Sequence, residues 1–409
     1  MLDFCLVRQP IFAAKGSLLG YEIRFRDSED GRHAFAQSFL SGTFDMVRGP
    51  FPAFLSCSRA QLLENAFSIV SPKVAILLLP SHLVVDDETL AAIMRFRDAG
   101  GVIGLDDLTE EPSPSELLLP HASWARVDVR CEDPVMIGRV CERIRNACAA
   151  LRITPPSLVA DHVYEPTQYE VAKSLNFDAY QGSFFSRPEP LPSSDLPQST
   201  VAAMRLMGMA RDQNVNDRQL EDVLATDPVL TFQLLRLVNS AAVGMRGVSS
   251  IGQALRLIGR SAFQRWLAVA VAASRRSTSG VDQELVRQAV ERGRLMEQLA
   301  NPTRDGGTLF LVGLFSLLDG VFRMPLPEIL TRVILSDEAT RALLEREGPY
   351  ADALGFAEAY ELGLFEHASQ LAGEMGVDPA KIGEYYTQAV AWTNDALSPA
   401  DAEPAVRGR

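Results

Sequence analysis

The sequence predicts a TIM-like (β/α) barrel followed by an all-α domain, and three observations carry this prediction. Short apolar runs alternate with longer helical patterns up to about residue 188. A proline-rich segment then interrupts the chain, and after it apolar residues recur at three- and four-residue spacing without a persistent strand pattern. The 409 residues, 47% of them hydrophobic, are enough to bury two separate cores.

Seven apolar or β-branched runs are predicted to form strands of the barrel. They cover residues 4–7, 21–25, 53–57, 74–79, 102–105, 124–129 and 157–160. Such short, nearly continuous apolar runs are typical of parallel strands that are buried on both faces. Seven or eight of these units in under 200 residues indicate a compact barrel, with its chemistry at the carboxyl ends of the strands.

The same patterns divide the chain into four segments. These are a barrel domain over 1–188, a linker over 189–198, a helical domain over 199–395 and a tail over 396–409. The boundary is placed in the linker because four prolines between residues 187 and 197 lack an amide donor and have a fixed φ. The tail has little apolar content, so we expect it to be disordered.

Composition excludes several classes of function. The net charge of −13 argues against a nucleic-acid binder, because such proteins need a concentrated basic face. The five cysteines lack the spacing of a zinc site, so reduced structural thiols are expected. No apolar run reaches the roughly 20 residues of a membrane span, and no signal-peptide pattern opens the chain. We therefore expect a cytoplasmic protein that does not enter the membrane.

The predicted barrel carries a series of motifs that resembles EAL domains, whose active members are cyclic-di-GMP phosphodiesterases. The resemblance extends over about 180 residues, and the motifs keep the family's order. They are Gln9-Pro10-Ile11, Gly20-Tyr21-Glu22-Ile23-Arg24-Phe25-Arg26, Leu105-Asp106-Asp107, Arg126-Val127-Asp128, Ala160-Asp161, Gln181-Gly182 and Arg187-Pro188.

This resemblance implies a site at the carboxyl ends of the strands. Active EAL domains hold two divalent cations with carboxylates and an Asn, and a water between the cations attacks the phosphodiester. Eight residues of this chain are then candidate remnants of a ligand-binding site. They are Gln9, Glu22, Arg26, Asp106, Asp107, Asp128, Asp161 and Gln181.

The chain departs from the family pattern at positions that bear on catalysis. Ser56 replaces an expected Asn, and the strand around Leu77 lacks the expected metal-binding Glu. Arg126 replaces a Lys and cannot donate a proton at neutral pH. Tyr164 replaces a Glu, while Asp161 is one methylene shorter than the family's Glu. From these changes we expect no catalytic residue and no bound metal.

The loop after Asp107 also departs from the family, because residues 108–114 lack the glycines that permit positive φ. One alternative stays open at this point. If Glu110 or Glu111 of this loop reaches the strand ends, an enzyme becomes the better interpretation.

The second half of the chain resembles an HDOD domain, a relative of the HD phosphohydrolases without their metal-binding His-Asp pair. The resemblance rests on residues 224–228, 234–241 and 249–259, with signature residues at Asp227, Pro228, Asn239 and Ser240. Asp227 is predicted to cap a helix that Pro228 begins. Ser316 stands where a catalytic motif needs His, and His367 is the one histidine in this half. A di-metal hydrolase is therefore not expected there.

These observations lead to two hypotheses of different classes. The first is a non-enzymatic bacterial signalling protein whose HDOD domain binds an unidentified signalling protein, with an inactive EAL domain for regulation or docking. The family resemblance implies a role in motility, biofilm or virulence, and a homodimer is the default assembly. The alternative is a cyclic-di-GMP receptor or a weak phosphodiesterase that depends on Mg²⁺ or Mn²⁺. The first hypothesis needs no cofactor.

Overall fold

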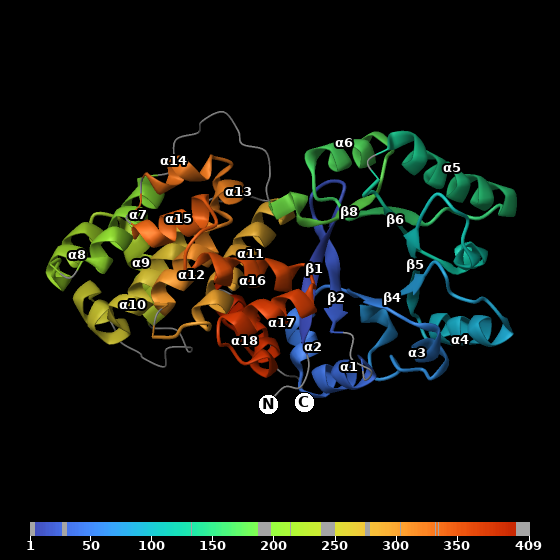
Figure 1. Cartoon of the computed structure of the whole chain (residues 1–409), viewed down its shortest axis with the longest axis horizontal. Coiled ribbons are helices and arrows are strands. Elements are labelled where there is room, and N and C mark those ends of the chain that lie inside the picture. The colour runs from blue at the N-terminus through green and yellow to red at the C-terminus, as the bar shows by residue number, and fades with distance from the viewer. Residues whose placement is uncertain are drawn as a thin grey trace. The chain divides into compact units, whose positions relative to one another are not determined.

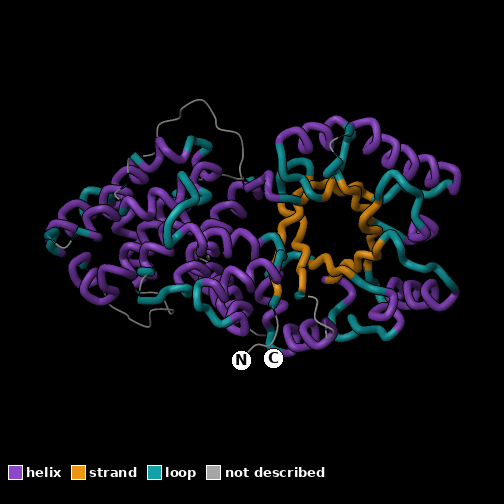
Figure 2. Tube along the Cα trace, in the orientation of Figure 1, coloured by secondary structure: helices purple, strands orange, loops and turns teal. Residues whose placement is uncertain are grey.

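The computed structural model contains a closed barrel of eight strands and a separate set of helices (Figure 1). The structure describes residues 5–26, 31–131, 133–186, 198–212, 214–238, 250–274, 279–302, 304–331, 333 and 335–397. The strands form a ring in the order β1 to β8, seen end-on in Figure 2. Their bounds are β1 Leu6–Ala13, β2 Leu18–Phe25, β3 Ala53–Ser56, β4 Ala75–Pro80, β5 Val102–Leu108, β6 Trp124–Asp128, β7 Ser157–Asp161 and β8 Ala179–Gln181.

Strand β1 runs antiparallel to both of its neighbours, β2 and β8, whereas the other neighbouring pairs are parallel. A tight turn joins β1 to β2: Gly16 has a φ of 81°, and the Ala13 amide donates to the Ser17 carbonyl at 2.8 Å. The prediction of a barrel is confirmed, but its uniform βα repeat is wrong at the start. A four-residue connection is long enough for a hairpin and too short for a helical crossover.

The barrel helices lie outside the ring of strands, as Figure 2 shows in purple. Their bounds are α1 Gly31–Leu40, α2 Thr43–Arg48, α3 Arg59–Leu63, α4 Asp87–Asp98, α5 Pro134–Leu151 and α6 Pro166–Ser174. Three 3₁₀ helices accompany them, at Pro72–Val74, Pro114–His121 and Ser183–Ser186. Several of these helices begin at a residue whose side chain caps the first turn. Asp133, for example, is the N-cap of α5, and its carboxylate accepts a hydrogen bond from the Val135 amide at 2.8 Å.

An apolar layer fills the interior of the barrel. It is formed by Ile11, Phe54, Ile76, Leu78, Val159 and Ala179, with Leu19, Val102 and Trp124 packed against it. Because side chains alternate along a strand, residues two positions further on face the same interior. Arg126, Asp161 and Gln181 follow Trp124, Val159 and Ala179 by two positions. A polar layer therefore lies directly beyond the apolar layer.

Gly182 occupies a position that a side chain cannot share. It follows β8 with a φ of 149°, and an added Cβ would lie 2.0 Å from the Val163 carbonyl oxygen. Backbone hydrogen bonds hold this approach, because the Val163 amide donates to Gln181 at 2.9 Å and the Phe184 amide donates to Val163 at 3.0 Å. The glycine after Gln181 thus allows β8 to close the ring.

The second half of the described chain is helical, apart from an isolated bridge between Asn301 and Arg304. This confirms the predicted all-α domain. The helices are α7 Gln198–Arg211, α8 Asp217–Leu224, α9 Pro228–Val238, α10 Ile251–Ala272, α11 Gly280–Glu297, α12 Gly306–Phe315, α13 Leu318–Phe322, α14 Leu326–Leu330, α15 Asp337–Leu344, α16 Ala351–Glu361, α17 Phe365–Glu374 and α18 Ile382–Leu397, with a 3₁₀ helix at Pro379–Lys381.

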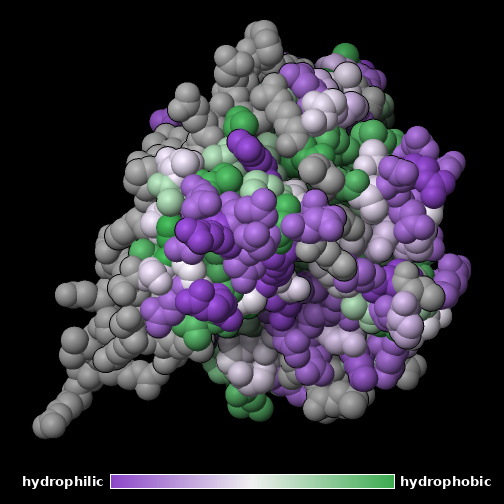
Figure 3. Space-filling view, turned by 90° about the vertical axis from the view of Figure 1, so that its left-hand side faces the viewer, coloured by the Kyte–Doolittle hydropathy of each residue, from purple (hydrophilic) through white to green (hydrophobic). Residues whose placement is uncertain are grey.

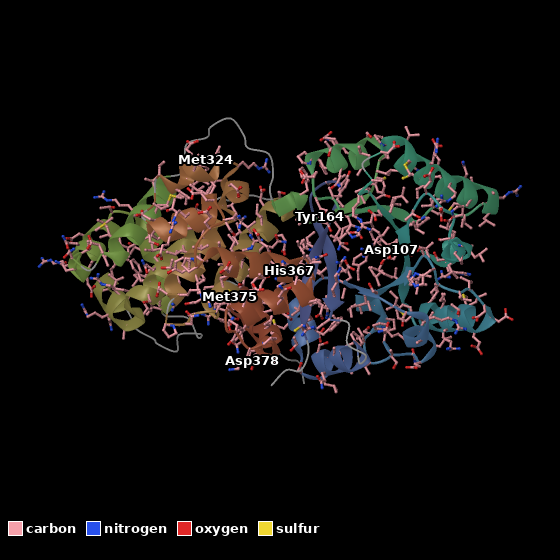
Figure 4. All side chains as sticks on the ribbon, viewed as in Figure 1. Asp107, Tyr164, Met324, His367, Met375 and Asp378 are labelled. Carbon is pink, nitrogen blue, oxygen red and sulfur yellow. The ribbon has the colours of Figure 1, made fainter. Side chains whose placement is uncertain are left out.

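Helix α12 is central to this half, since every residue from Thr308 to Phe315 is buried. It approaches α11 so closely that a Cβ on Gly313 would lie 2.8 Å from the Arg292 carbonyl oxygen. Ser316, the residue in place of a catalytic His, accepts a hydrogen bond from Arg292 Nη1 at 2.8 Å. His367 lies on α17, as labelled in Figure 4.

Asp227 caps α9, because its Oδ1 accepts from the Leu230 amide at 3.0 Å and the helix begins at Pro228. Asn239 and Ser240 lie outside the described residues, as do 189–197 of the predicted linker and 398–409 of the predicted tail. Within the described residues, no helix is both long and apolar enough to cross a membrane.

The chain divides into two compact units. The first comprises Met1–Ser186 with Ser279–Glu284 and Tyr360–Phe365, and the second comprises Arg187–Thr278, Leu285–Ala359 and Glu366–Arg409. The barrel lies in the first unit, and helices α7 to α10 and α12 to α15 lie in the second.

We expect Gly182→Ala to destabilise the barrel by more than about 3 kcal/mol, because the new Cβ would overlap the Val163 carbonyl. Urea unfolding followed by circular dichroism measures the change. Gly138→Ala in α5 is the matched control, since a Cβ there would lie 3.6 Å from Leu175 and alanine favours a helix by about 1 kcal/mol. Equal effects of the two substitutions would contradict the assigned role of Gly182.

Candidate functional site

Three acidic residues surround one arginine at the carboxyl ends of the strands. Arg126 Nη2 donates to Asp161 Oδ2, Nη1 lies 3.2 Å from Glu22 Oε1, and Nε lies 3.1 Å from Asp106 Oδ1. Arg126 and Glu22 are each 2% exposed, Asp161 is 4% exposed and Asp106 is 8% exposed. The cluster is therefore buried, and its ion pairs are screened far less than pairs on the surface.

The strand register brings these side chains together. Glu22 of β2 pairs with Gln9 of β1, whereas β6 and β7 place Arg126 beside Val159. Asp106 lies near the end of β5 and Asp161 is the last residue of β7. Parallel strands end at the same edge, so β2, β5, β6 and β7 deliver their polar side chains to one mouth of the barrel.

The residues that follow two of these carboxylates have unusual backbone conformations. Asp107 has a φ of 52° and His162 a φ of 64°, in the left-handed region that non-glycine residues seldom adopt. In each case the turned amide donates to the preceding carboxylate: Asp107 to Asp106 Oδ1 at 3.0 Å, and His162 to Asp161 Oδ1 at 2.8 Å. Such conformations gather at functional sites, where the surrounding structure holds them.

Glu22 has further polar neighbours. Gln181 Nε2 donates to Glu22 Oε2 at 2.5 Å and also lies 3.4 Å from Gln9 Oε1, whereas Arg24 Nη2 lies 3.2 Å from Glu22 Oε2. The Gln181 carbonyl oxygen Oε1 is buried and has no hydrogen-bond partner. Gln9, Glu22, Arg24 and Gln181 therefore join the cluster around Arg126.

The cluster sets the protonation of its members. Burial raises the pKa of Glu22, but Arg126 and then Arg24 outweigh it and hold that pKa below its usual value. Burial raises the pKa of Asp106 to about 7, against the opposing pull of Arg126, and the neighbouring carboxylates raise it further. Burial lowers the pKa of Arg126, but Asp161, Glu22 and Asp106 together raise it well above its usual value. Two arginines thus face three carboxyl groups, and burial brings the pKa of Asp106 close to neutral pH.

Strands β3 and β4 contribute no acid to the cluster. Ser56 ends β3 and pairs with Leu78 in register. Leu77 alternates with Ile76 and Leu78, which belong to the interior apolar layer, so its side chain faces away from that layer. Leu78 is therefore the inward residue next to the predicted position Leu77, and β4 contains no acidic residue at either position.

Other predicted residues lie at the rim rather than in the cluster. Asp128 is half-buried, and it accepts from Arg130 Nε at 2.8 Å and lies 3.8 Å from His162 Nδ1. The Tyr164 ring packs edge-on against His162 with centroids 5.8 Å apart. Asp107 and Tyr164 are exposed and lie on the barrel half in Figure 4. Arg26 is half-buried, and its amide donates to the Cys5 carbonyl at 3.0 Å.

The loop after β5 is bound to helix α5. Glu110 lies 3.0 Å from Arg139, and Arg143 donates to the Thr109 carbonyl at 2.7 Å and to Glu116 at 3.0 Å. Glu110 is therefore directed to α5, and Glu111 is exposed. Neither supplies the missing acid of the cluster.

Sequence reasoning missed the arrangement around Arg126. It named Arg126 as a replacement for Lys and treated Asp106 and Asp161 as remnants, but it did not predict that one guanidinium meets all three acids. Alternation along β6 and β7 is the signal that could have found it, because Arg126 and Asp161 follow the inward-facing Trp124 and Val159 by two positions.

The described arrangement does not fit a divalent metal. No three His, Cys, Asp or Glu side chains of the described residues are placed to share an ion. The reason is geometric: each carboxylate contacts a different nitrogen of Arg126, whereas a cation needs oxygens that converge within about 2.0–2.6 Å of one point.

Comparison with known proteins adds the family context. An HDOD domain model matches residues 196–332. The chain is 26% identical over 424 aligned residues to cyclic di-GMP phosphodiesterase CdgJ of Vibrio cholerae, covering 95% of this chain and 92% of that protein. Two solved structures are also similar: the phosphodiesterase PaMucR in complex with c-di-GMP, and Klebsiella pneumoniae BlrP1 in complex with calcium and c-di-GMP.

The similarity to these structures is confined to part of the chain. PaMucR is 16% identical with a TM-score of 0.38, over 46% of this chain and 96% of that chain. BlrP1 is 17% identical with a TM-score of 0.38, over 46% of this chain and 56% of that chain. The described residues thus form a closed eight-stranded barrel and a helical half, and the HDOD domain model matches residues within that half.

Our predictions of a non-enzymatic protein and of no metal cofactor are wrong in the light of these comparisons. The Vibrio relative is named a phosphodiesterase, and the BlrP1 structure contains calcium with c-di-GMP. Those predictions gave most weight to the loss of two expected ligands, the Asn that Ser56 replaces and the Glu that is absent from β4. Three carboxylates from β2, β5 and β7 nevertheless meet at the barrel mouth.

The raised pKa of Asp106 predicts a pH dependence of stability. The folded state binds the proton on Asp106 more tightly than the unfolded state does. The part of the free energy of unfolding that comes from Asp106 therefore falls as pH rises from about 4 to about 7. Relative to Asp106→Asn, the wild type should lose stability over this window, by at most about 4 kcal/mol. Urea titrations of both proteins at pH 4.5 and 7.5 measure it. The same pH slope in both proteins would refute the assignment.

Proposed function

We propose that the barrel domain binds cyclic-di-GMP and hydrolyses it slowly, as a cyclic-di-GMP phosphodiesterase. The observation that carries this proposal is the similarity, over 95% of the chain, to a Vibrio protein of that name. The cluster of Glu22, Asp106 and Asp161 at the carboxyl ends of the strands supports the location of the site.

The chemistry of the cluster suits phosphodiester hydrolysis. The reaction needs a group that takes a proton from water and positive charge beside the phosphoryl oxygens. The pKa of Asp106, raised to about 7 by burial, lies where a group exchanges protons at neutral pH. Arg24, whose side chain is 31% exposed, is a guanidinium at the mouth that can donate to a phosphate. The buried Arg126 and the lack of an acid on β3 and β4 favour a slow reaction.

A cyclic-di-GMP receptor is the second candidate, and one observation favours it. Arg126 stands among the carboxylates, so the positive charge at the mouth is held by the protein's own side chains. Fixed guanidinium groups bind phosphate without cleaving it. Binding and hydrolysis must therefore be measured separately.

Three further expectations stay predictions: a signalling protein as partner of the HDOD domain, a homodimer, and a cytoplasmic location. On the face shown in Figure 3, hydrophilic side chains are interspersed with hydrophobic ones. Val201, Leu257 and Leu344 of the helical half are exposed on three different helices. Isolated exposed apolar residues are common and do not define a docking surface.

Titration calorimetry of the full chain with cyclic-di-GMP, with and without Mg²⁺ or Mn²⁺, tests the proposal together with chromatography for the linear dinucleotide. We expect binding and slow formation of product. Asp106→Asn should lower the turnover at least about 100-fold, because it removes the group that exchanges a proton, and leave the dissociation constant within about tenfold.

Asp45→Asn is the control, because Asp45 is exposed on α2 and pairs with Arg48 outside the site. It should leave both quantities unchanged. Binding without product would favour the receptor, whereas the absence of binding under every condition would overturn both candidates.

A further inference from the structure

We propose that the segment Tyr360–Phe365 is a positioning element of the candidate site, which orients Gln9 and Arg24 beside Glu22. The segment belongs to the same compact unit as the barrel, although Glu361 follows Gln9 by 352 positions in the sequence. The proposal deepens the proposed function and rests on it for the ligand, cyclic-di-GMP.

One buried hydrogen bond anchors the segment to strand β1. The hydroxyl of Tyr360, a residue that is 1% exposed, donates to the Leu6 carbonyl at 2.9 Å. The Tyr360 ring also packs edge-on against Phe365, with ring centroids 5.3 Å apart. The two ends of the segment are therefore in contact, and the residues between them form a turn next to the start of β1.

The segment fixes the orientation of the Gln9 side-chain amide. Gln9 Nε2 donates to the Glu361 carbonyl at 3.0 Å, which leaves Gln9 Oε1 to face Gln181 Nε2 at 3.4 Å. The same Gln181 nitrogen donates to Glu22 Oε2 at 2.5 Å. A side-chain amide has distinct donor and acceptor ends, so the Glu361 carbonyl decides which end of Gln9 meets Gln181.

Gly363 makes room for the Arg24 side chain. It has a φ of 75°, and its amide donates to the Tyr360 carbonyl at 2.9 Å, as is typical of a glycine that ends a helix. An added Cβ would lie 3.3 Å from Arg24 Cδ and 3.8 Å from Arg24 Nη1. The other terminal nitrogen, Nη2, lies 3.2 Å from Glu22 Oε2. The turn and the acid therefore hold Arg24 together.

The strand register explains why one turn contacts both residues. In the hairpin of β1 and β2, Val7 pairs with Arg24 and Gln9 pairs with Glu22. Val7 and Gln9 are two positions apart, so their side chains lie on the same face of β1. Val7 Cγ1 would also lie 3.8 Å from a Cβ on Gly363. The turn thus packs against the part of the hairpin that carries Glu22.

The position of Arg24 matters for binding because its guanidinium is the group at the mouth that can donate to a phosphate. Its side chain is 31% exposed, and an arginine that is free to move loses rotamer entropy when it binds a ligand. Contact with the turn reduces this loss by restricting Arg24 before the ligand arrives. The affinity of the barrel site therefore depends on Tyr360–Phe365.

Calorimetric titration of the full-length protein with cyclic-di-GMP tests the proposal through Gly363→Asn. Asparagine tolerates a positive φ, so the turn is kept while the new side chain displaces Arg24. The dissociation constant should rise at least about fivefold, because a charge-assisted hydrogen bond to phosphate is weakened. In an Arg24→Ala background, Gly363→Asn should change the constant by less than about twofold, because the residue it displaces is gone.

Gly376→Asn is the matched control. Gly376 has the same φ of 75°, and its amide donates to the Gly373 carbonyl at 3.0 Å. Among the described residues, no atom beyond its chain neighbours lies within 4 Å of an added Cβ. This variant should leave the dissociation constant unchanged. An equal loss of affinity in the two Asn variants, or the same loss with and without Arg24, would overturn the proposal.

Tyr360→Phe is a milder variant that removes only the hydroxyl bound to the Leu6 carbonyl. It should raise the dissociation constant by about twofold or more, because the turn loses its anchor. This variant decides the matter if Gly363→Asn does not fold, and an unchanged constant would then contradict the positioning role.

Thermal unfolding without nucleotide separates this proposal from the proposed function. Gly363→Asn should lower the melting temperature of the wild type by more than it lowers that of Arg24→Ala, whereas Gly376→Asn should shift both proteins equally. If the wild type does not bind cyclic-di-GMP, the proposed function is wrong. Equal shifts by Gly363→Asn in the two backgrounds would refute the positioning of Arg24, whatever the result with the nucleotide.

Discussion

The mouth of the barrel depends on one interaction, the contact of the Arg126 guanidinium with three buried carboxylates. Glu22, Asp106 and Asp161 come from three strands, and a positive charge at their centre offsets much of the cost of burying them. The cluster also explains the backbone around it. Asp107 and His162 adopt left-handed conformations because their amides turn back to Asp106 and Asp161, and these bonds fix the carboxylates toward Arg126.

The polar cluster and the apolar layer beneath it are parts of one arrangement. Alternation along each strand places Trp124, Val159 and Ala179 in the apolar layer and Arg126, Asp161 and Gln181 two residues later in the polar layer. The apolar layer fills the barrel interior next to the cluster, and the charged side chains of the cluster are themselves buried. They are therefore largely removed from water. Low local dielectric strengthens the ion pairs, and it makes the proton on Asp106 favourable near neutral pH.

The sequence predicted the barrel well because buried parallel strands leave a strong local signal. The predicted strand at 157–160 lies within β7, and the predicted strand at 74–79 overlaps β4 except at its first residue. Strand β8, with only Ala179–Gln181, is too short to show such a signal, and the hairpin of β1 and β2 depends on a turn at Gly16. The candidate site was predicted residue by residue from motifs. Motifs do not show which side chains contact one another, because that depends on the face of the strand on which each side chain lies. On β4, for example, Leu78 faces the interior, whereas the predicted Leu77 faces away from it.

The shortness of β8 has a consequence for how the barrel assembles. Gln181 bonds to Glu22, which precedes it by 159 positions, and β8 joins β1 to β7 to complete the ring. Until the ribosome has delivered this last strand, β1 and β7 are open sheet edges, and Glu22 lacks its amide partner. Contacts of such long range make folding slow, and open edges invite pairing with other chains. The three residues of β8 thus also cover the two open edges of the nascent barrel.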